Sequence, residues 1–147
     1  CTPQGIIDWL EINDIDLRGE LVTVLGRSEI VGKPLVNMLI DKGATVINCN
    51  SKTLKDDMKK FMKMSDIVIS AIGKPKKFDS DWFLPCTIII DVGINRDEYG
   101  KLCGDINREE VEGHYESCYV TPVPGGVGLL TRATLLKNVM NSYDMTN

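Results

Sequence analysis

One turn between two apolar segments constrains the fold of this chain more than any other feature. Residues 26–34 read Gly-Arg-Ser-Glu-Ile-Val-Gly-Lys-Pro; the apolar run 21–25 precedes them and the apolar-rich stretch 35–40 follows. A short continuous apolar run is typical of a buried strand, and the stretch after the turn suits a helix. The sequence therefore predicts a strand, a tight glycine turn and a helix at this place.

The same alternation continues along the chain. Helices are predicted over residues 3–12, 33–42, 54–64 and 131–143, and strands over 21–25, 44–49, 66–71, 87–92 and 119–121, with a turn at 97–100. Strands that alternate with helices indicate an α/β fold. We expect a Rossmann-type, doubly wound and mostly parallel sheet with helices on both faces, formed as one domain over residues 1–147, with ligands beyond the carboxyl ends of its strands.

Composition narrows the class of protein. The 147 residues are 43% hydrophobic, enough for a sizeable core, and no apolar run approaches the ~20 residues that span a bilayer. A net charge of −4 argues against a nucleic-acid surface. The N-terminal residues do not show the pattern of a signal peptide, and the five cysteines form no CxxC pair. We therefore expect a soluble cytoplasmic protein with buried, inert thiols, no bound metal and no membrane partner.

The turn at residues 26–34 suits a bound phosphate. A helix N-terminus offers free N–H donors, Gly26 allows close backbone approach, and Arg27 adds a charged fork. The usual GxGxxG pattern is not intact because Ser28 and Val31 replace its second and third glycines. The Walker A spacing also fails, which disfavours a triphosphate hydrolase. A purely structural glycine turn remains the alternative.

The end of the second predicted strand favours NADP over NAD. An NAD-selective site places Asp or Glu there to bind the ribose 2′-hydroxyl, whereas this chain reads Asn-Cys-Asn-Ser-Lys over residues 48–52. Ser51 and Lys52 are able to donate to a 2′-phosphate, and Arg27 approaches from the first turn. The alternative interpretation is a polar turn before the next helix.

Four more segments combine glycine with proline or polar residues after a predicted strand. They are residues 71–75, 91–95, 103–105 and 121–128. Asp91 and Asp105 are acid–base candidates, although carboxylates that cap nearby backbone amides fit the same positions. His114, the single histidine, is expected on the surface. No catalytic triad, carboxylate pair or metal-ligand set is evident, so no catalytic residue is assigned.

Taken in order, the motifs resemble one family closely. The blocks are Cys-Thr-Pro-Gln-Gly at 1–5, GRSxxVGxP at 26–34, Asp-Val-Gly-Ile-Asn at 91–95, Gly-Asp at 104–105 and TPVPGGVG at 121–128. They resemble the C-terminal nucleotide-binding domain of the bifunctional methylenetetrahydrofolate dehydrogenase/methenyltetrahydrofolate cyclohydrolases. This chain departs from that family at Leu129-Leu130, where Pro-Met is usual, and at Asn50, where histidine is common.

The resemblance assigns roles to individual residues. It implies that Gly26, Arg27 and Ser28 contact the cofactor phosphates and that Ser51 binds the 2′-phosphate of NADP. Two further groups of residues are implied, a nicotinamide end formed by Gly73, Ile94 and Thr121, and a border of the folate cleft formed by Pro124, Gly125 and Gly126. Such enzymes oxidise 5,10-methylenetetrahydrofolate with NADP and hydrolyse the methenyl product in one-carbon metabolism.

The family's catalytic lysine and tyrosine have no counterpart in this chain. They are spaced as Tyr-x-x-x-Lys in an N-terminal folate-binding domain, and no tyrosine here precedes a lysine by four residues. We therefore expect that the folate domain is missing and that this fragment alone is inactive. The resemblance also implies that the parent enzyme is a homodimer. The alternatives are a stand-alone NAD(P)-binding regulatory module and a fragment of a trifunctional C1-tetrahydrofolate synthase.

Overall fold

A five-stranded parallel sheet forms the centre of the molecule. The computed structural model describes residues 1–145. The sheet has the order β2-β1-β3-β4-β7. Its strands are β1 (Leu21–Leu25), β2 (Thr45–Cys49), β3 (Ile67–Ser70), β4 (Ile88–Asp91) and β7 (Tyr119–Val120). The expected parallel sheet is confirmed, with strand bounds that agree with the sequence within two residues.

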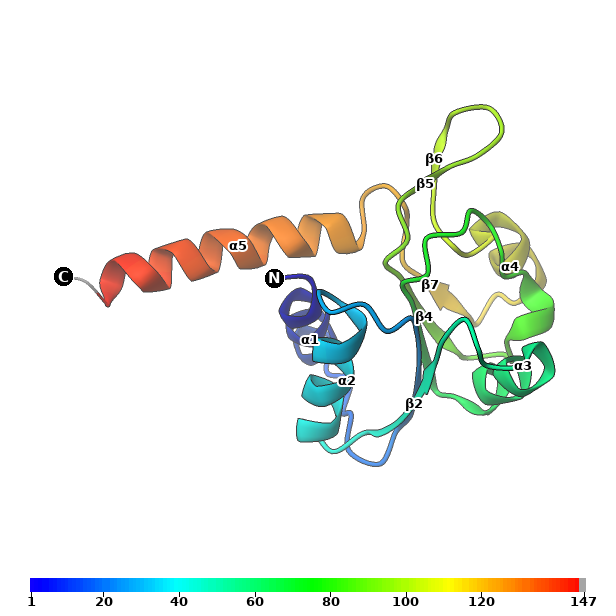
Figure 1. Cartoon of the computed structure of the whole chain (residues 1–147), viewed down its shortest axis with the longest axis horizontal. Coiled ribbons are helices and arrows are strands. Elements are labelled where there is room, and N and C mark those ends of the chain that lie inside the picture. Colours follow the sequence, from blue (N-terminus) through cyan, green and yellow to red (C-terminus); the bar gives the residue numbers. More distant parts are fainter. Residues whose placement is uncertain (146–147) are drawn as a thin grey trace.

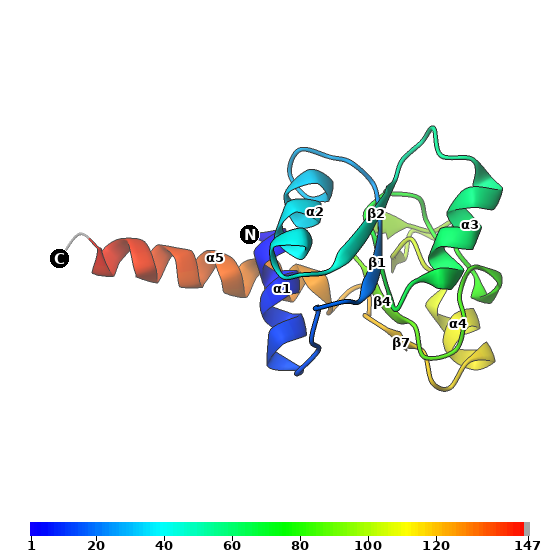
Figure 2. The same ribbon diagram turned by 90° about the horizontal axis from the view of Figure 1, so that it is seen from below.

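Helices cover both faces of this sheet (Figure 1). They are α1 (Thr2–Ile12), α2 (Gly32–Asp41), α3 (Lys55–Met64), the 3-10 turn η1 (Ser80–Trp82), α4 (Arg108–His114) and α5 (Val127–Asp144). Helices α1 and α2 lie on one face, and α3 and α4 lie on the other (Figure 2). A short antiparallel hairpin, β5 (Asn95–Arg96) with β6 (Leu102–Cys103), projects beyond the sheet.

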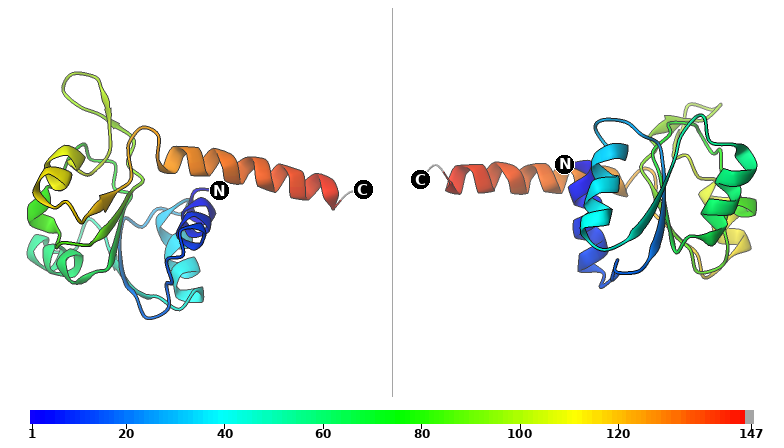
Figure 3. Two further views of the ribbon diagram at one scale, coloured as in Figure 1. Left: turned by 180° about the vertical axis from the view of Figure 1, so that it is seen from behind. Right: turned by 60° about the horizontal axis from the view of Figure 1, so that its bottom comes forward.

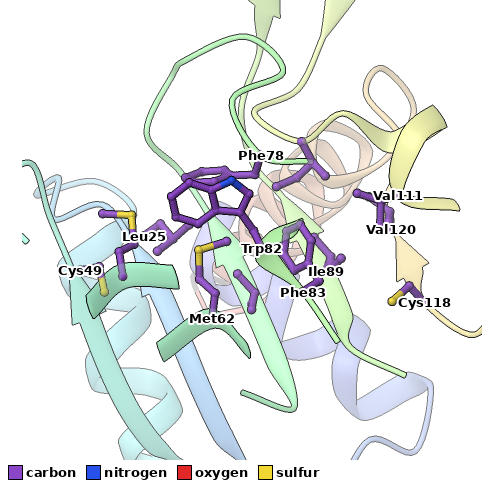
Figure 4. Packing of buried hydrophobic residues seen from close by; sticks show 13 residues of the cluster. Leu25, Cys49, Met62, Phe78, Trp82, Phe83, Ile89, Val111, Cys118 and Val120 are labelled. Carbon is purple, nitrogen blue, oxygen red and sulfur yellow. The ribbon is translucent and has the colours of Figure 1, made fainter. Parts of the chain in front are cut away.

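Alternate residues of each central strand pack into different cores. Val68 of β3 joins the core under α3 and α4, whereas Ile67 and Ile69 join the core under α1 and α2. Side chains of a strand alternate between faces, so a strand covered on both faces must be apolar throughout. Figure 4 shows the α3/α4 core, where Phe78 meets the indole of Trp82 edge to face with ring centroids 4.9 Å apart.

The strand order creates a switch point between β1 and β3. The chain passes from β1 through α2 to β2, and then through α3 to β3 on the opposite side of β1. The connection that follows β1 therefore runs toward β2, and the connection that follows β3 runs in the opposite direction, toward β4. This divergence opens a crevice between the ends of β1 and β3. Ligands of doubly wound folds bind at this kind of crevice.

Helix α5 extends away from the sheet (Figure 3). It begins at Val127, which is buried, four residues before the predicted start, so its first turn includes Gly128 of the glycine-rich segment. Only Val127 and Thr134 of this helix are buried. Its first half packs on α1, where a Cβ atom on Gly5 would lie 3.0 Å from the Leu130 carbonyl oxygen.

One helix was not predicted, and one sequence expectation needs correction. Residues 108–114 form a helix that periodicity did not reveal, since Val111 is its one buried residue. Cys49, Cys103 and Cys118 are buried free thiols whose pKa is raised by burial, as expected, but Cys1 and Cys86 are exposed. Within residues 1–145, no helix has the length and apolar character needed to cross a membrane.

Candidate functional site

The glycine turn after β1 is packed directly against the end of β3. Gly26 has φ +112°, and a Cβ atom there would lie 2.6 Å from the carbonyl oxygen of Ala71. The Gly26 N–H donates to the Cys49 carbonyl at 2.8 Å, and the Gly26 carbonyl accepts a hydrogen bond from the Asn48 side-chain amide at 2.8 Å. Only glycine fits this position, so the backbone of the turn is exposed to an approaching ligand.

Ser28 organises the N-terminus of α2. Its Oγ atom accepts hydrogen bonds from the Val31 and Gly32 N–H groups at 3.2 and 3.3 Å. A serine hydroxyl that accepts these bonds also carries one proton, with which it is able to donate to an anion. A Cβ atom on Gly32 would lie 2.5 Å from the Gly26 carbonyl oxygen. Gly32 thus allows the close packing of helix on turn that a dinucleotide fingerprint assigns to its third glycine.

A cleft of about 270 Å³ opens at the switch point between β1 and β3. We call it the switch-point cleft; residues that line it include Gly26, Arg27, Ser51, Ile72, Lys74 and Lys77. Three residues predicted to bind the cofactor, Gly26, Arg27 and Ser51, therefore come together here although they lie on two different loops. No Asp or Glu lines this cleft within the described part of the chain.

A second cleft, of about 450 Å³, lies between the β4 end and the start of α5. We call it the proline–glycine cleft; its lining includes Ile94, Pro124, Gly125, Gly126 and Arg132. Gly125 has φ +98°, and a Cβ atom on Gly126 would lie 2.3 Å from the Pro122 carbonyl oxygen. The three residues expected to border a folate cleft thus line the same opening as Ile94, whose side chain is 71% exposed.

Gly73 and Thr121 occupy different surroundings from Ile94. Gly73 is exposed with φ +68°, and its Cβ position would lie 4.0 Å from the Asn95 Oδ1 atom. Thr121 is buried, and its Oγ1 atom accepts the Asp91 N–H at 2.8 Å. Thr121 ties β4 to β7 and lines a smaller cavity beneath the β5–β6 hairpin rather than the proline–glycine cleft.

Asp91 and Asp105 are structural acceptors at the strand ends. Asp91 accepts the N–H groups of Gly93, Asp105 and Ile106 at 2.9, 3.0 and 2.9 Å. Burial raises the pKa of Asp91 to about 6; the three amide donors oppose this shift, and the nearby charge of Asp105 adds to it. This network confirms the capping interpretation of Asp91.

The carboxylate of Asp105 holds the loop after β3. It accepts the Ile72 and Lys74 N–H groups at 2.9 Å and the Ser70 hydroxyl at 2.8 Å, and it also accepts the side-chain amide of Asn95 at 2.9 Å. Asp105 is fully buried. It therefore positions the segment that carries Lys74, and the capping interpretation is confirmed for Asp105 as well.

Other chemical groups are placed outside the clefts. His114 is exposed, as expected, and its ring meets Tyr115 with centroids 4.5 Å apart. No group of three or more His, Cys, Asp or Glu side chains within residues 1–145 is arranged to hold a metal ion.

Comparison with known proteins gives consistent results. Residues 1–147 match the sequence profile of the family described as "Tetrahydrofolate dehydrogenase/cyclohydrolase, NAD(P)-binding domain". The chain is 44% identical over 142 residues to the bifunctional protein FolD of Bacillus cereus (strain G9842), a match that covers 97% of this chain and 48% of that protein. The chain thus spans about half the length of the curated relatives it matches.

Two solved structures are similar to the whole chain. The bifunctional FolD methylenetetrahydrofolate dehydrogenase/cyclohydrolase of Campylobacter jejuni superposes with a TM-score of 0.93 at 41% identity, covering 100% of this chain and 51% of that one. The Trypanosoma brucei enzyme, complexed with NADP and an inhibitor, gives a TM-score of 0.89 at 33% identity, covering 99% and 50%.

Proposed function

The chain belongs to the tetrahydrofolate dehydrogenase/cyclohydrolase family, whose NAD(P)-binding domain it matches along its length, and we propose that it binds NADP for the oxidation of 5,10-methylenetetrahydrofolate. The observation that carries this proposal is the switch-point cleft, where a glycine cradle, Arg27 and Ser51 meet and no acidic side chain intervenes. Such a lining favours an anion, and an acid at the end of β2 would repel a 2′-phosphate.

Each end of the cofactor has residues suited to hold it. The Gly26 backbone and the Ser28 hydroxyl are proposed to bind the pyrophosphate, and the Arg27 guanidinium and Ser51 the 2′-phosphate. The nicotinamide end is proposed to lie toward Gly73, Ile94 and Thr121. When bound, NADP supplies the acceptor for a hydride, while the protein orients the cofactor and limits its motion.

The substrate side of the site is proposed at the proline–glycine cleft. Pro124, Gly125 and Gly126 present a backbone-rich wall with no ionisable group of their own, so they border a folate rather than act on it. None of the tyrosines in this chain precedes a lysine by four residues. We propose that the parent enzyme supplies the lysine and tyrosine, and the subsequent cyclohydrolase step, from the part of the relatives that this chain does not match.

A binding and turnover experiment on the chain tests this function. NADP at saturating concentration is expected to raise the thermal unfolding temperature because it binds only the folded state. Addition of 5,10-methylenetetrahydrofolate is expected to give no methenyl product above background. Absence of any NADP-induced stabilisation would contradict the binding proposal, and measurable methenyl formation would contradict the proposed location of the catalytic residues.

Assembly and cell compartment are further parts of the proposal. The β5–β6 hairpin projects from the sheet with Tyr99 86% exposed at its tip, and we infer that it contributes to a homodimer. Sedimentation velocity with and without Tyr99→Ser checks this inference, since a monomer at high concentration would contradict it.

A cytoplasmic location is proposed because Cys86 and the buried cysteines are all free thiols.

A further inference from the structure

Three cationic side chains converge on the switch-point cleft. Arg27 comes from the turn after β1, and Lys74 and Lys77 come from the segment after β3. The chain as a whole carries a net charge of −4, yet this cleft has a purely cationic set of ionisable side chains apart from the buried thiol of Cys49. The local field is therefore positive on a molecule of opposite overall sign.

These three cations have no carboxylate partner within the described residues 1–145. The ion pairs found there involve other lysines and arginines, and Lys76, which lies between Lys74 and Lys77 in the sequence, pairs with Asp97 at 3.6 Å. What distinguishes these three cations is that they line one cleft to which no Asp or Glu side chain of the described residues contributes. A cleft of this charge suits an external anion.

The segment that carries the two lysines is held firmly by its backbone. The Lys74 N–H donates to the Asp105 carboxylate at 2.9 Å, the Lys76 N–H donates to the Gly104 carbonyl at 2.9 Å, and the Phe78 N–H donates to the Asp105 carbonyl at 3.1 Å. The buried network described above thus fixes where both lysines leave the main chain. Pre-organised charges bind an anion with a smaller loss of conformational entropy.

Lys77 lies in a crowded cationic environment. Partial burial lowers the pKa of its ammonium group, and the neighbouring charges of Lys74 and Lys55 lower it further, while Asp105 opposes them. Its Nζ atom lies 5.5 Å from the centroid of the Phe78 ring. A bound anion would relieve this repulsion between like charges.

We propose that Lys74 and Lys77, together with Arg27 and Ser51, bind the ribose 2′-phosphate of NADP and set the preference for NADP over NAD. This inference rests on the proposed function, because it assigns further residues to the same cofactor site. A 2′-phosphate carries up to two negative charges at neutral pH, whereas the 2′-hydroxyl of NAD carries none. The two lysines therefore discriminate between the cofactors by charge.

Affinity measurements with paired ligands test the proposal. Lys74→Met and Lys77→Met remove the charge and keep the aliphatic stem, and Lys76→Met is the matched control because that lysine pairs with Asp97. Each protein is titrated with NADP, NAD, 2′,5′-ADP and 5′-AMP. We expect each of the first two substitutions to weaken the binding of NADP and 2′,5′-ADP about tenfold and to change the binding of NAD and 5′-AMP less than about twofold, in line with a charged hydrogen bond. Lys76→Met is expected to change none of the four.

The outcomes separate this inference from the proposed function. If the wild-type chain binds neither NADP nor 2′,5′-ADP, the proposed function fails. If the wild-type chain binds NADP but the lysine variants keep its NADP-to-NAD affinity ratio, the inference alone is overturned. Equal losses for NADP and NAD also overturn it, since they would place the lysines at the pyrophosphate. Thermal unfolding of each variant without ligand checks that the fold is intact.

Discussion

The backbone N–H of Asp105 donates to the Oδ1 atom of Asp91 at 3.0 Å, so one buried carboxylate fixes the position of the residue that bears the second. Asp91 ends β4, and Asp105 follows the β5–β6 hairpin. Asp105 in turn holds the loop after β3 that lines the switch-point cleft. The two acids thus connect the ends of β4, β6 and β3, and they position the residues of the site.

The pKa of Asp91 is expected to be measurable as a titration near pH 6. Burial raises this pKa to about 6 from an ordinary value of 3.8. Carboxyl-carbon NMR of the folded protein should show the Asp91 resonance changing with that midpoint, and an Asp91→Asn variant identifies the resonance by its absence. A midpoint at or below pH 4 would show that the amide donors outweigh burial.

The raised pKa also predicts how folding stability depends on pH. Between pH 4 and pH 6 the folded state keeps a proton on Asp91 that the unfolded state has released. The contribution of Asp91 to stability is therefore complete below about pH 4 and decreases as pH rises through about 6, by roughly 1.4 kcal/mol per pH unit in that interval. Urea unfolding of the wild type minus Asp91→Asn measures this contribution; a difference that grows with pH would contradict it.

Gly104→Ala is expected to destabilise the protein by roughly 3 kcal/mol or more, or to prevent folding. A Cβ atom at Gly104 would lie 1.8 Å from the Asp91 Oδ2 atom, which is buried and cannot move into solvent. Gly113→Ala is the matched control: it lies in α4 with no atom within 4 Å of the added carbon, so it should stabilise the protein slightly. Thermal unfolding compares the two variants, and equal stability would refute the role of Gly104.

Arg27→Ala is expected to weaken NADP binding about tenfold or more, because the guanidinium faces the switch-point cleft without a carboxylate partner in the described residues. Because Arg27 is proposed to contact the 2′-phosphate, which NAD lacks, NAD binding should weaken much less. Arg18→Ala removes a charge that pairs with Asp16 outside this cleft and serves as the control. Equal losses of NADP and NAD affinity would contradict the 2′-phosphate role of Arg27.

The sequence predicted the sheet well because buried parallel strands have a simple signature. The run at 21–25 is apolar throughout and forms β1 with the bounds expected. Helix α4 was missed because Val111 alone among its residues is buried, so no amphipathic period marks it. The exposure of Cys86 was also missed, since this residue adopts φ +67° in a surface turn, where free cysteine's usual tendency to be buried does not apply.

The candidate site was predictable only in part. Gly26, Arg27 and Ser51 were found because a glycine turn and the end of the second strand carry recognisable chemistry. Lys77 was not, because nothing in its own segment marks it; its place in the cleft depends on β3 lying beside β1. Gly104 was singled out only as part of the Gly-Asp block at 104–105, because its contact with the Asp91 carboxylate depends on the tertiary structure.

The central claim is that this chain holds NADP at the switch-point cleft by its 2′-phosphate. Isothermal titration calorimetry of the chain with NADP and with NAD tests it most directly. The account predicts one NADP bound per chain, with an affinity at least about tenfold higher than that for NAD, as expected for a phosphate that gains a charged hydrogen bond. Equal affinity for the two cofactors, or no heat of binding for NADP at any concentration tested, would contradict it.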